Sequence, residues 1–202
     1  HLCEALAAAG LTDLVRIDRL ELPPGPGEAR QADLSQAEAT REALRGAELV
    51  VQVASIHPWK RYPDEQYLDL KVKGAWHVYA DCRELGIGKV VLTSSIAAIG
   101  YHFAPEQWPV TEDQMGTLTD LYSFTKHAQE DIARHHAAIH GIRTIALRPP
   151  AFMPKGALET GVGLLGAFTL VEDVVAAHGA AVQAPDLPER FEACFVTNPV
   201  PY

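Results

Sequence analysis

The sequence predicts an α/β fold in which helices flank a parallel, doubly wound sheet. Short apolar segments of strand character alternate along the chain with longer helical segments. Three of the predicted helices end at a glycine, namely Gly10, Gly86 and Gly141. The chain has 202 residues, of which 48% are hydrophobic, enough for one domain with its own core.

Six segments are predicted to be strands because they are short, apolar and bounded by turn residues. In chain order they are residues 14–18, 29–33, 48–54, 90–93, 142–147 and 191–196. The proline- and glycine-rich residues 23–27 form a loop between the first two strands. Strands that alternate with helices in this way run parallel to one another.

Five helices complete the alternation. In chain order they are residues 2–9, 35–44, 64–85, 122–140 and 172–184. Ser35 and Glu38 have the spacing of a capping box, which opens the second helix. The third helix is predicted to be long and continuous up to Gly86.

A glycine-rich turn is missing from the start of this pattern. A dinucleotide-binding sheet opens with a strand, a glycine-rich turn and a helix whose N-terminus receives the pyrophosphate. The sequence has no such motif, and residues 1–10 have the character of the remainder of that helix. In the strand order 3-2-1-4-5-6 the first strand is central, so its loss would separate strands 14–18 and 48–54. Each unpaired buried group would cost about 1–3 kcal/mol. We therefore expect the printed sequence to be a partial record that lacks the first strand and the glycine loop.

Tyr122 and Lys126 are the most informative pair in the sequence. They lie four residues apart on one predicted helix, hence on the same face. A nearby lysine favours the phenolate and lowers the pKa of a tyrosine toward the working range of a base. A hydroxyl from Thr93, Ser94 or Ser95, at the end of strand 90–93, could then orient a substrate oxygen. Alternatively, the same spacing fits a core tyrosine followed by a lysine that extends to solvent.

The sequence resembles the NAD-dependent epimerase/dehydratase family of extended short-chain dehydrogenases/reductases. The matching stretches occur in the family's order and cover most of the chain. They are residues 31–34, 51–55, 86–100, 122–126, 147–152 and 171–174. The resemblance implies a Rossmann-like domain over residues 1–150. It further implies a partial substrate-binding lobe over residues 151–202, interleaved with the last Rossmann elements. Only 11 residues separate Gly156 from Phe168, where the family has a longer stretch, so this lobe is expected to be reduced or incomplete.

The resemblance assigns roles to individual residues. The implied catalytic residues are Ser95, Tyr122 and Lys126. The implied contacts to NAD are Asp18, Asp33, Leu34, Ala54, Ser55, Thr93, Tyr122, Lys126, Pro149, Ala151 and Phe152. The implied substrate contacts are Ser95, Ile96, His57 and Trp59. Lys71 stands where the family usually has an asparagine, which puts that active-site amide in doubt.

Asp18 favours NAD over NADP, because an acid at the end of the second Rossmann strand repels a 2′-phosphate. Arg19 follows it and could in principle receive that phosphate. Without the resemblance, Asp18 would be a turn residue and Asp33 an acid flanking a helix. Trp59 could stack on a sugar face or simply cover the core.

Composition excludes several classes of partner. The net charge is −9 without a basic cluster, which argues against nucleic acid and anionic membranes. Three distant cysteines, Cys3, Cys82 and Cys194, are expected to be buried thiols in a reducing, cytoplasmic compartment. His136 and His140 have the i,i+4 spacing of zinc ligands, but no glutamate follows His136, so no metal is expected.

Three functions remain open at this stage. The first is an NAD-dependent oxidoreductase or epimerase that transfers hydride at a carbinol carbon of a sugar or nucleotide-sugar. The second is a reductase or dehydrogenase of an apolar alcohol or ketone, favoured by the apolar residues 96–99. The third is a non-catalytic dinucleotide-binding protein. The absence of an acid pair after Ser95 argues against dehydration. A homodimer through helices 64–85 and 122–140 is implied by the resemblance alone.

Overall fold

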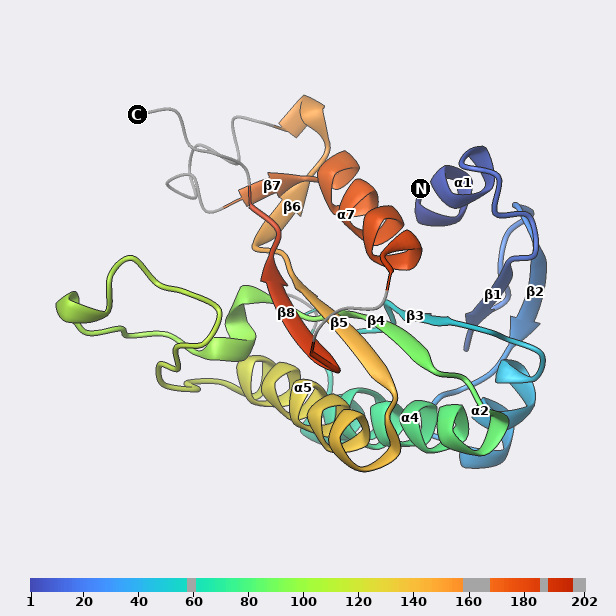
Figure 1. The fold of residues 1–202 in the computed structure, drawn as a ribbon, viewed down its shortest axis with the longest axis horizontal. Coiled ribbons are helices and arrows are strands. Elements are labelled where there is room, and N and C mark those ends of the chain that lie inside the picture. Colours follow the sequence, from blue (N-terminus) through green and yellow to red (C-terminus); the bar gives the residue numbers. More distant parts are fainter. Residues whose placement is uncertain (58–60, 158–167, 186–188, 198–202) are drawn as a thin grey trace.

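The computed structural model describes residues 1–57, 61–157, 168–185 and 189–197. Within them, parallel strands form a layer with helices on both faces (Figure 1). The central sheet has the order β3-β4-β5-β8 and all of its described pairs are parallel. Its strands are β3 (Val50–Gln52), β4 (Lys89–Thr93), β5 (Arg143–Arg148) and β8 (Phe191–Phe195). The predicted doubly wound α/β fold is thus confirmed.

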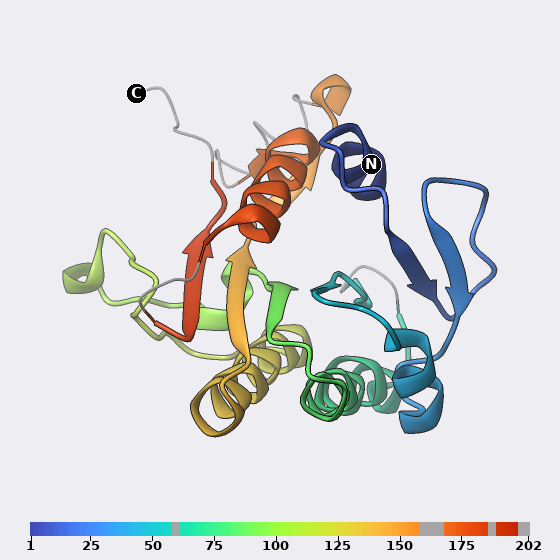
Figure 2. The same cartoon turned by 45° about the vertical axis from the view of Figure 1, so that its right-hand side comes forward.

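A second, two-stranded sheet lies beside the central one (Figure 2). It pairs β1 (Val15–Asp18) in parallel with β2 (Glu28–Gln31). Among the described residues β1 pairs with β2, β3 pairs with β4, and no ladder joins β1 to β3. This is the separation expected between strands 14–18 and 48–54. A third parallel pair joins β6 (Ala151–Met153) to β7 (Phe168–Leu170).

The helices divide between the two faces of the central sheet. One face carries α2 (Ala37–Leu44), α4 (Gly74–Leu85) and α5 (Leu121–His140), and the other carries α7 (Val171–Gln183) (Figure 1). The short α1 (Leu2–Ala8) lies next to α7. None of the helices among the described residues combines the length and apolar character that crossing a bilayer requires.

Alternate residues of β4 supply the two halves of the core. Val90 and Leu92 pack with Val78 and Tyr79 of α4, whereas Val91 packs with Ala181 of α7. A strand that is covered on both faces needs apolar residues at every position, because successive side chains point to opposite sides. This explains the continuous apolar run that predicted the strand.

The helix predicted over residues 64–85 is not a single α-helix. It consists of α3 (Asp64–Tyr67), a π-helical segment at Leu68–Lys73, and α4, which ends at Gly86 with φ +74°. π-helical turns widen the helix and often occur at functional sites. Here the wide turn carries Lys71 into the interior.

Two smaller expectations were also wrong. The Ser35 side chain does not cap α2; Gln36 is at the cap position, and Asp33 Oδ1 instead accepts a hydrogen bond from Ser35 N at 2.9 Å. Of the three cysteines, Cys82 is buried, but Cys3 and Cys194 are only half-buried. All three are free thiols.

The segment between β4 and α5 is fixed where it leaves and returns to the sheet. Tyr101 N donates to Thr117 O at 2.9 Å, and Thr117 N donates to Tyr101 O at 2.7 Å. Gly100 has φ +79°, and a Cβ there would lie 2.7 Å from Thr117 O, so glycine is required. Asp120 then caps α5 by accepting from Ser123 N at 2.6 Å. This start of α5 sets the position of Tyr122.

Candidate active site

The predicted site residues gather at the carboxyl ends of β3 and β4 and at the start of α5. In a parallel sheet all strands end at the same edge, which is where such folds bind ligands. Ser95 follows β4 and begins a 3₁₀ turn at Ile96–Ile99. Tyr122 and Lys126 lie on the first turns of α5, which packs against that 3₁₀ turn.

Ser95 and Tyr122 are in direct contact. Burial raises the pKa of the half-buried Tyr122 phenol, and a hydrogen bond with the Ser95 side chain opposes this rise. The charge of Asp120 adds to the rise. Ser95 Oγ also accepts from Ala97 N at 3.2 Å, which holds the hydroxyl in place. The neighbouring Ser94 is buried and donates to Glu130 Oε1 at 2.6 Å.

Lys126 lies beneath this pair in the interior. Its side chain is 2% exposed, and Nζ donates to Thr93 O at 2.6 Å. Burial lowers the pKa of Lys126 to about 8, against an opposing effect of Glu130. The sequence suggested that Lys126 lowers the pKa of Tyr122, but in this structure burial is the larger influence and the pKa is raised. Lys126 is thus close enough to the end of β4 to contact a ligand bound there.

Lys71 is a second buried lysine at this site, and the sequence indicated only that it replaces an asparagine. Its side chain is fully buried, with Nζ 3.8 Å from the centroid of the Tyr122 ring and 5.9 Å from that of Tyr67. Nζ has no hydrogen-bond partner in the described part of the chain. Burial and then the charge of Lys126 lower the pKa of Lys71 to about 6, and Asp120 opposes them.

A buried ion-pair network behind the site was not found from the sequence. Glu130 on α5 is fully buried and accepts two hydrogen bonds from Arg148, at 2.8 and 2.6 Å. It also accepts bonds from Ser94 and from Arg134, the latter at 3.0 Å. Arg148, at the end of β5, further donates to Glu112 O at 2.7 Å. The network ties α5 to the ends of β4 and β5, and so fixes the spacing of Ser95 and Tyr122.

Two histidines adjoin the catalytic residues proposed from the sequence. The ring centroid of His57 lies 6.2 Å from that of Tyr122. His178 of α7 is buried, with Nδ1 2.7 Å from Val174 O and Nε2 2.7 Å from Thr93 Oγ1. The Val174 contact requires Nδ1 to carry the proton, so Nε2 accepts from Thr93. Trp59 lies outside the described residues.

The predicted cofactor residues lie at or just after the ends of five strands, β1 to β5, and at the start of β6. Asp18 is the last residue of β1, Asp33 lies two residues after β2, and both are exposed. One oxygen of Asp18 accepts from Leu20 N at 2.9 Å, as a turn residue would. A hydrogen bond from Ser35 N holds the pKa of Asp33 below its usual range, so its carboxylate stays ionised. Leu34 packs on the core next to Gly74, where an added Cβ would lie 3.2 Å from Leu34 Cβ.

The remaining predicted contacts lie after β3, after β5 and in β6. Ala54 is half-buried and Ser55 exposed after β3. Pro149 is buried and accepts from Ile96 N at 3.2 Å, which joins the ends of β4 and β5. Ala151 is half-buried and Phe152 is 48% exposed.

The residues present fit a dinucleotide without a 2′-phosphate. Two exposed carboxylates, at Asp18 and Asp33, offer acceptors for ribose hydroxyls or an amino group and would repel a phosphate there. Lys126 Nζ lies at the end of β4, where it donates to Thr93 O.

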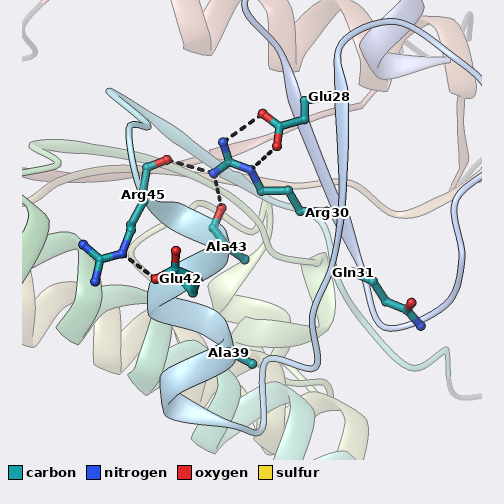
Figure 3. A pocket seen from close by; sticks show the side chains of 7 residues that line it. All are labelled: Glu28, Arg30, Gln31, Ala39, Glu42, Ala43 and Arg45. Carbon is teal, nitrogen blue, oxygen red and sulfur yellow. Dashed lines mark hydrogen bonds and ion pairs between the residues drawn. The ribbon is translucent and has the colours of Figure 1, made fainter.

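Two other groups of side chains lie away from the proposed site. Within the described ranges, no three histidine, cysteine or acidic side chains are close enough together to hold a metal ion. His136 is instead buried against Trp76 and Tyr79. A surface hollow lies between β2 and α2 (Figure 3). There Arg30 donates to Glu28 and to Ala43 O, so its guanidinium is already paired with a carboxylate.

Comparison with known proteins identifies the class that this fold and site define. The model of the NAD dependent epimerase/dehydratase family matches residues 1–161, and the chain belongs to this family. NAD, the expected cofactor, is the cofactor of that family.

The relatives have different activities. The chain is 28% identical over 162 residues to UDP-glucose 4-epimerase of Azospirillum brasilense, covering 73% of this chain and 44% of the relative. It is 23% identical over 141 residues to uronate dehydrogenase of Pseudomonas syringae pv. tomato, covering 68% and 50%. The chain thus spans about half the length of these relatives. The crystal structure of uronate dehydrogenase from Agrobacterium tumefaciens superposes with a TM-score of 0.81 at 24% identity, covering 96% of this chain and 71% of that one.

Proposed function

We propose that the protein is an NAD-dependent oxidoreductase or epimerase that acts at a carbinol carbon of a sugar or nucleotide-sugar. The observation that carries the proposal is the hydrogen bond between the side chains of Ser95 and Tyr122, with Lys126 buried four residues along α5 and bonded to Thr93 O. The printed names of two relatives, an epimerase of UDP-glucose and a dehydrogenase of uronate, support a sugar substrate.

Each residue has a role that follows from its contacts. Tyr122, as a phenolate, removes the proton of the substrate hydroxyl. Ser95 donates to the substrate oxygen and holds it in line with the phenolate, a position that its bond from Ala97 N keeps fixed. Lys126 stabilises negative charge at the phenol and extends toward the ribose through the end of β4. NAD, when bound, supplies the hydride acceptor.

The same residues serve both a dehydrogenase and an epimerase. In a dehydrogenase the carbonyl compound leaves as the product. In an epimerase it would stay bound, turn its other face to the cofactor, and take back the proton from Tyr122, while NAD, when bound, would supply the returning hydride to that face. His57, next to the Tyr122 ring, is the residue we propose to contact the substrate beyond the reacting carbon.

The test is a substrate panel with the purified protein and NAD. We expect NADH formation with a uronate, or interconversion of UDP-glucose and UDP-galactose. Tyr122→Phe should lose about 10²- to 10⁴-fold in rate, the usual contribution of a general base. Equal rates for the wild type and Tyr122→Phe would refute the assignment.

An apolar alcohol or ketone is the second candidate. It is favoured by the apolar residues 96–99 after Ser95. Of these, however, Ala97, Ala98 and Ile99 are buried in the core, and Ile96 alone is half-exposed. One partly exposed side chain makes a weaker apolar lining than four, so we rank this candidate below a sugar. Turnover of an aliphatic or aromatic alcohol but of no sugar would reverse the order.

We also propose a homodimer through α3–α4 and α5. Leu68, Trp76, Phe124 and Ile139 on these helices are large apolar side chains that are 39–65% exposed. Light scattering during gel filtration should give twice the mass of the chain. A charge introduced by Trp76→Glu should reduce the mass to that of a monomer, whereas a monomeric wild type would refute the proposal.

A further inference from the structure

Lys71 is the buried side chain that the proposed reaction leaves without a role. A lysine amine is a strongly hydrated group and is rarely buried without a partner. Here the side chain is 0% exposed, and in the described residues Nζ has no hydrogen-bond partner. Its nearest aromatic neighbour is the ring of Tyr122, at 3.8 Å from the centroid. A buried amine held over the proposed base suggests an effect on that base.

The groups around Lys71 come from two helices. From α3, the Tyr67 ring lies 5.9 Å away. From the start of α5 come Asp120, Tyr122 and Lys126, and the two charged groups act on Lys71 in opposite directions. On its own π-helical segment, Asp69 and Lys73 are exposed to solvent. Tyr122 is thus the group closest to Lys71 whose charge changes in the proposed reaction.

We propose that Lys71 sets the ionisation of Tyr122, by carrying a proton whenever Tyr122 is a phenolate. Nζ lies over the ring and makes no hydrogen bond to the phenol oxygen, so the phenol gives its proton to solvent and the Lys71 amine takes one up from solvent. The net charge of the pair stays at zero. An ammonium over the ring attracts a phenolate much more strongly than a phenol, because the phenolate ring carries the added negative charge. Lys71 is therefore a residue that acts through Tyr122, by favouring the negative charge on its ring, and does not itself touch the substrate. The proposal rests on the proposed function, in which Tyr122 is the base.

The properties of Lys71 suit this exchange. Burial lowers the pKa of Lys71 to about 6, so a proton on this amine needs an opposite charge beside it, and a phenolate at Tyr122 would supply that charge. Lys126 differs, because its Nζ already donates to Thr93 O. The two lysines thus have different roles. Lys126 lies on the ligand side of the site, whereas Lys71 gains its positive charge when the Tyr122 ring becomes negative.

The first test measures the ionisation of Tyr122 without substrate or NAD. The near-ultraviolet absorbance of tyrosinate is recorded against pH, and the same curve for Tyr122→Phe is subtracted to isolate one of the six tyrosines. We expect Lys71→Met to raise the midpoint of this ionisation by about one unit or more. Lys71→Arg, which keeps a positive charge, should leave the midpoint at or below that of the wild type. Lys73→Met removes an exposed lysine two residues along and serves as the matched control.

An unchanged midpoint in Lys71→Met, with a wild-type circular dichroism spectrum, would overturn the proposal. A second measurement leaves Lys71 in place. The ¹⁵N resonance of Lys71 Nζ is followed against pH in the wild type and in Tyr122→Phe. The amine should hold its proton to higher pH in the wild type, and identical titrations would overturn the proposal. Neither measurement needs turnover, so both can be made on a protein that is inactive on every sugar. Such inactivity would refute the proposed function, whereas the two titrations would still test the effect of Lys71 on Tyr122.

Discussion

The substitution Glu130→Ala tests the network that holds the proposed site together. Glu130 is fully buried and receives four hydrogen bonds, two from Arg148 and one each from Ser94 and Arg134. Its loss leaves the Arg148 guanidinium, 2% exposed, with the Glu112 carbonyl as its remaining described partner. Breaking a buried pair in this way costs about 3–5 kcal/mol.

The expected loss is large against the whole stability of the fold. A domain of this size has a free energy of unfolding of about 5–15 kcal/mol. At about 2–4 °C per kcal/mol, Glu130→Ala should lower the melting temperature by roughly 6–20 °C. Urea unfolding followed by circular dichroism gives the free energy directly.

Asp131→Ala is the matched control, one residue along the same helix. Asp131 also pairs with Arg134, at 3.1 Å, but its side chain is 59% exposed. Exposed pairs contribute about 0–1 kcal/mol, so this variant should unfold almost like the wild type. If Glu130→Ala costs no more than Asp131→Ala, the network does not hold the site and the reasoning fails.

The cost of Glu130→Ala should also depend on pH. Burial alone would raise the pKa of Glu130, but its bonds from Arg148, Ser94 and Arg134 hold it below the usual value. The folded state therefore binds this proton more weakly than the unfolded chain does. The stabilisation is complete above the unfolded pKa of about 4.3 and is lost as the pH falls through the folded value. The difference between wild type and variant should shrink in acid.

Three further predictions concern the site and its supports. Ser95→Ala removes a hydrogen bond that lowers the pKa of Tyr122, so the oxidation rate should fall by roughly 10²-fold. In a plot of rate against pH, the acid limb should move to higher pH, and an unmoved limb would contradict this. Lys71 binds its proton more weakly folded than unfolded between about pH 6 and 10.5, so wild-type stability should rise with pH there, by at most about 1.4 kcal/mol per unit. In urea unfolding, the free energy of unfolding of Lys71→Met should therefore exceed that of the wild type by more at neutral pH than at alkaline pH. A difference that does not change with pH would count against a buried amine. Gly100→Ala should cost more than Gly86→Ala in the same assay: both have positive φ, but a Cβ meets a backbone oxygen at 2.7 Å at Gly100 and nothing within 4 Å at Gly86.

Patterns within short stretches predicted most of the fold. The strand predicted over residues 90–93 is β4, because a continuous apolar run is what a strand covered on both faces requires. Gly86 and Gly141 end α4 and α5 in the left-handed conformation, as glycines at these positions predict. The π-helical turn at Leu68–Lys73 was missed because its residues have ordinary helical character. The packing around the segment is not visible in its own sequence.

The site was predictable only in part, for a related reason. Tyr122 and Lys126 are close in sequence, so their helical spacing is readable. Glu130 reads as one more acid on a helix, because its partners Ser94 and Arg148 are 36 and 18 residues away. Lys71 was visible as a departure from a family asparagine, but its burial over the Tyr122 ring required the fold.

Following one hydrogen atom tests the central proposal most directly. A uronate or UDP-glucose deuterated at the reacting carbinol carbon is incubated with the protein and NAD, and the products are analysed by mass spectrometry. Hydride transfer assisted by Ser95 and Tyr122 predicts that deuterium appears in the reduced nicotinamide, or on the inverted carbon of an epimer. Tyr122→Phe should slow both by about 10²- to 10⁴-fold. Deuterium lost to water, or labelled product formed equally well by Tyr122→Phe, would contradict the account.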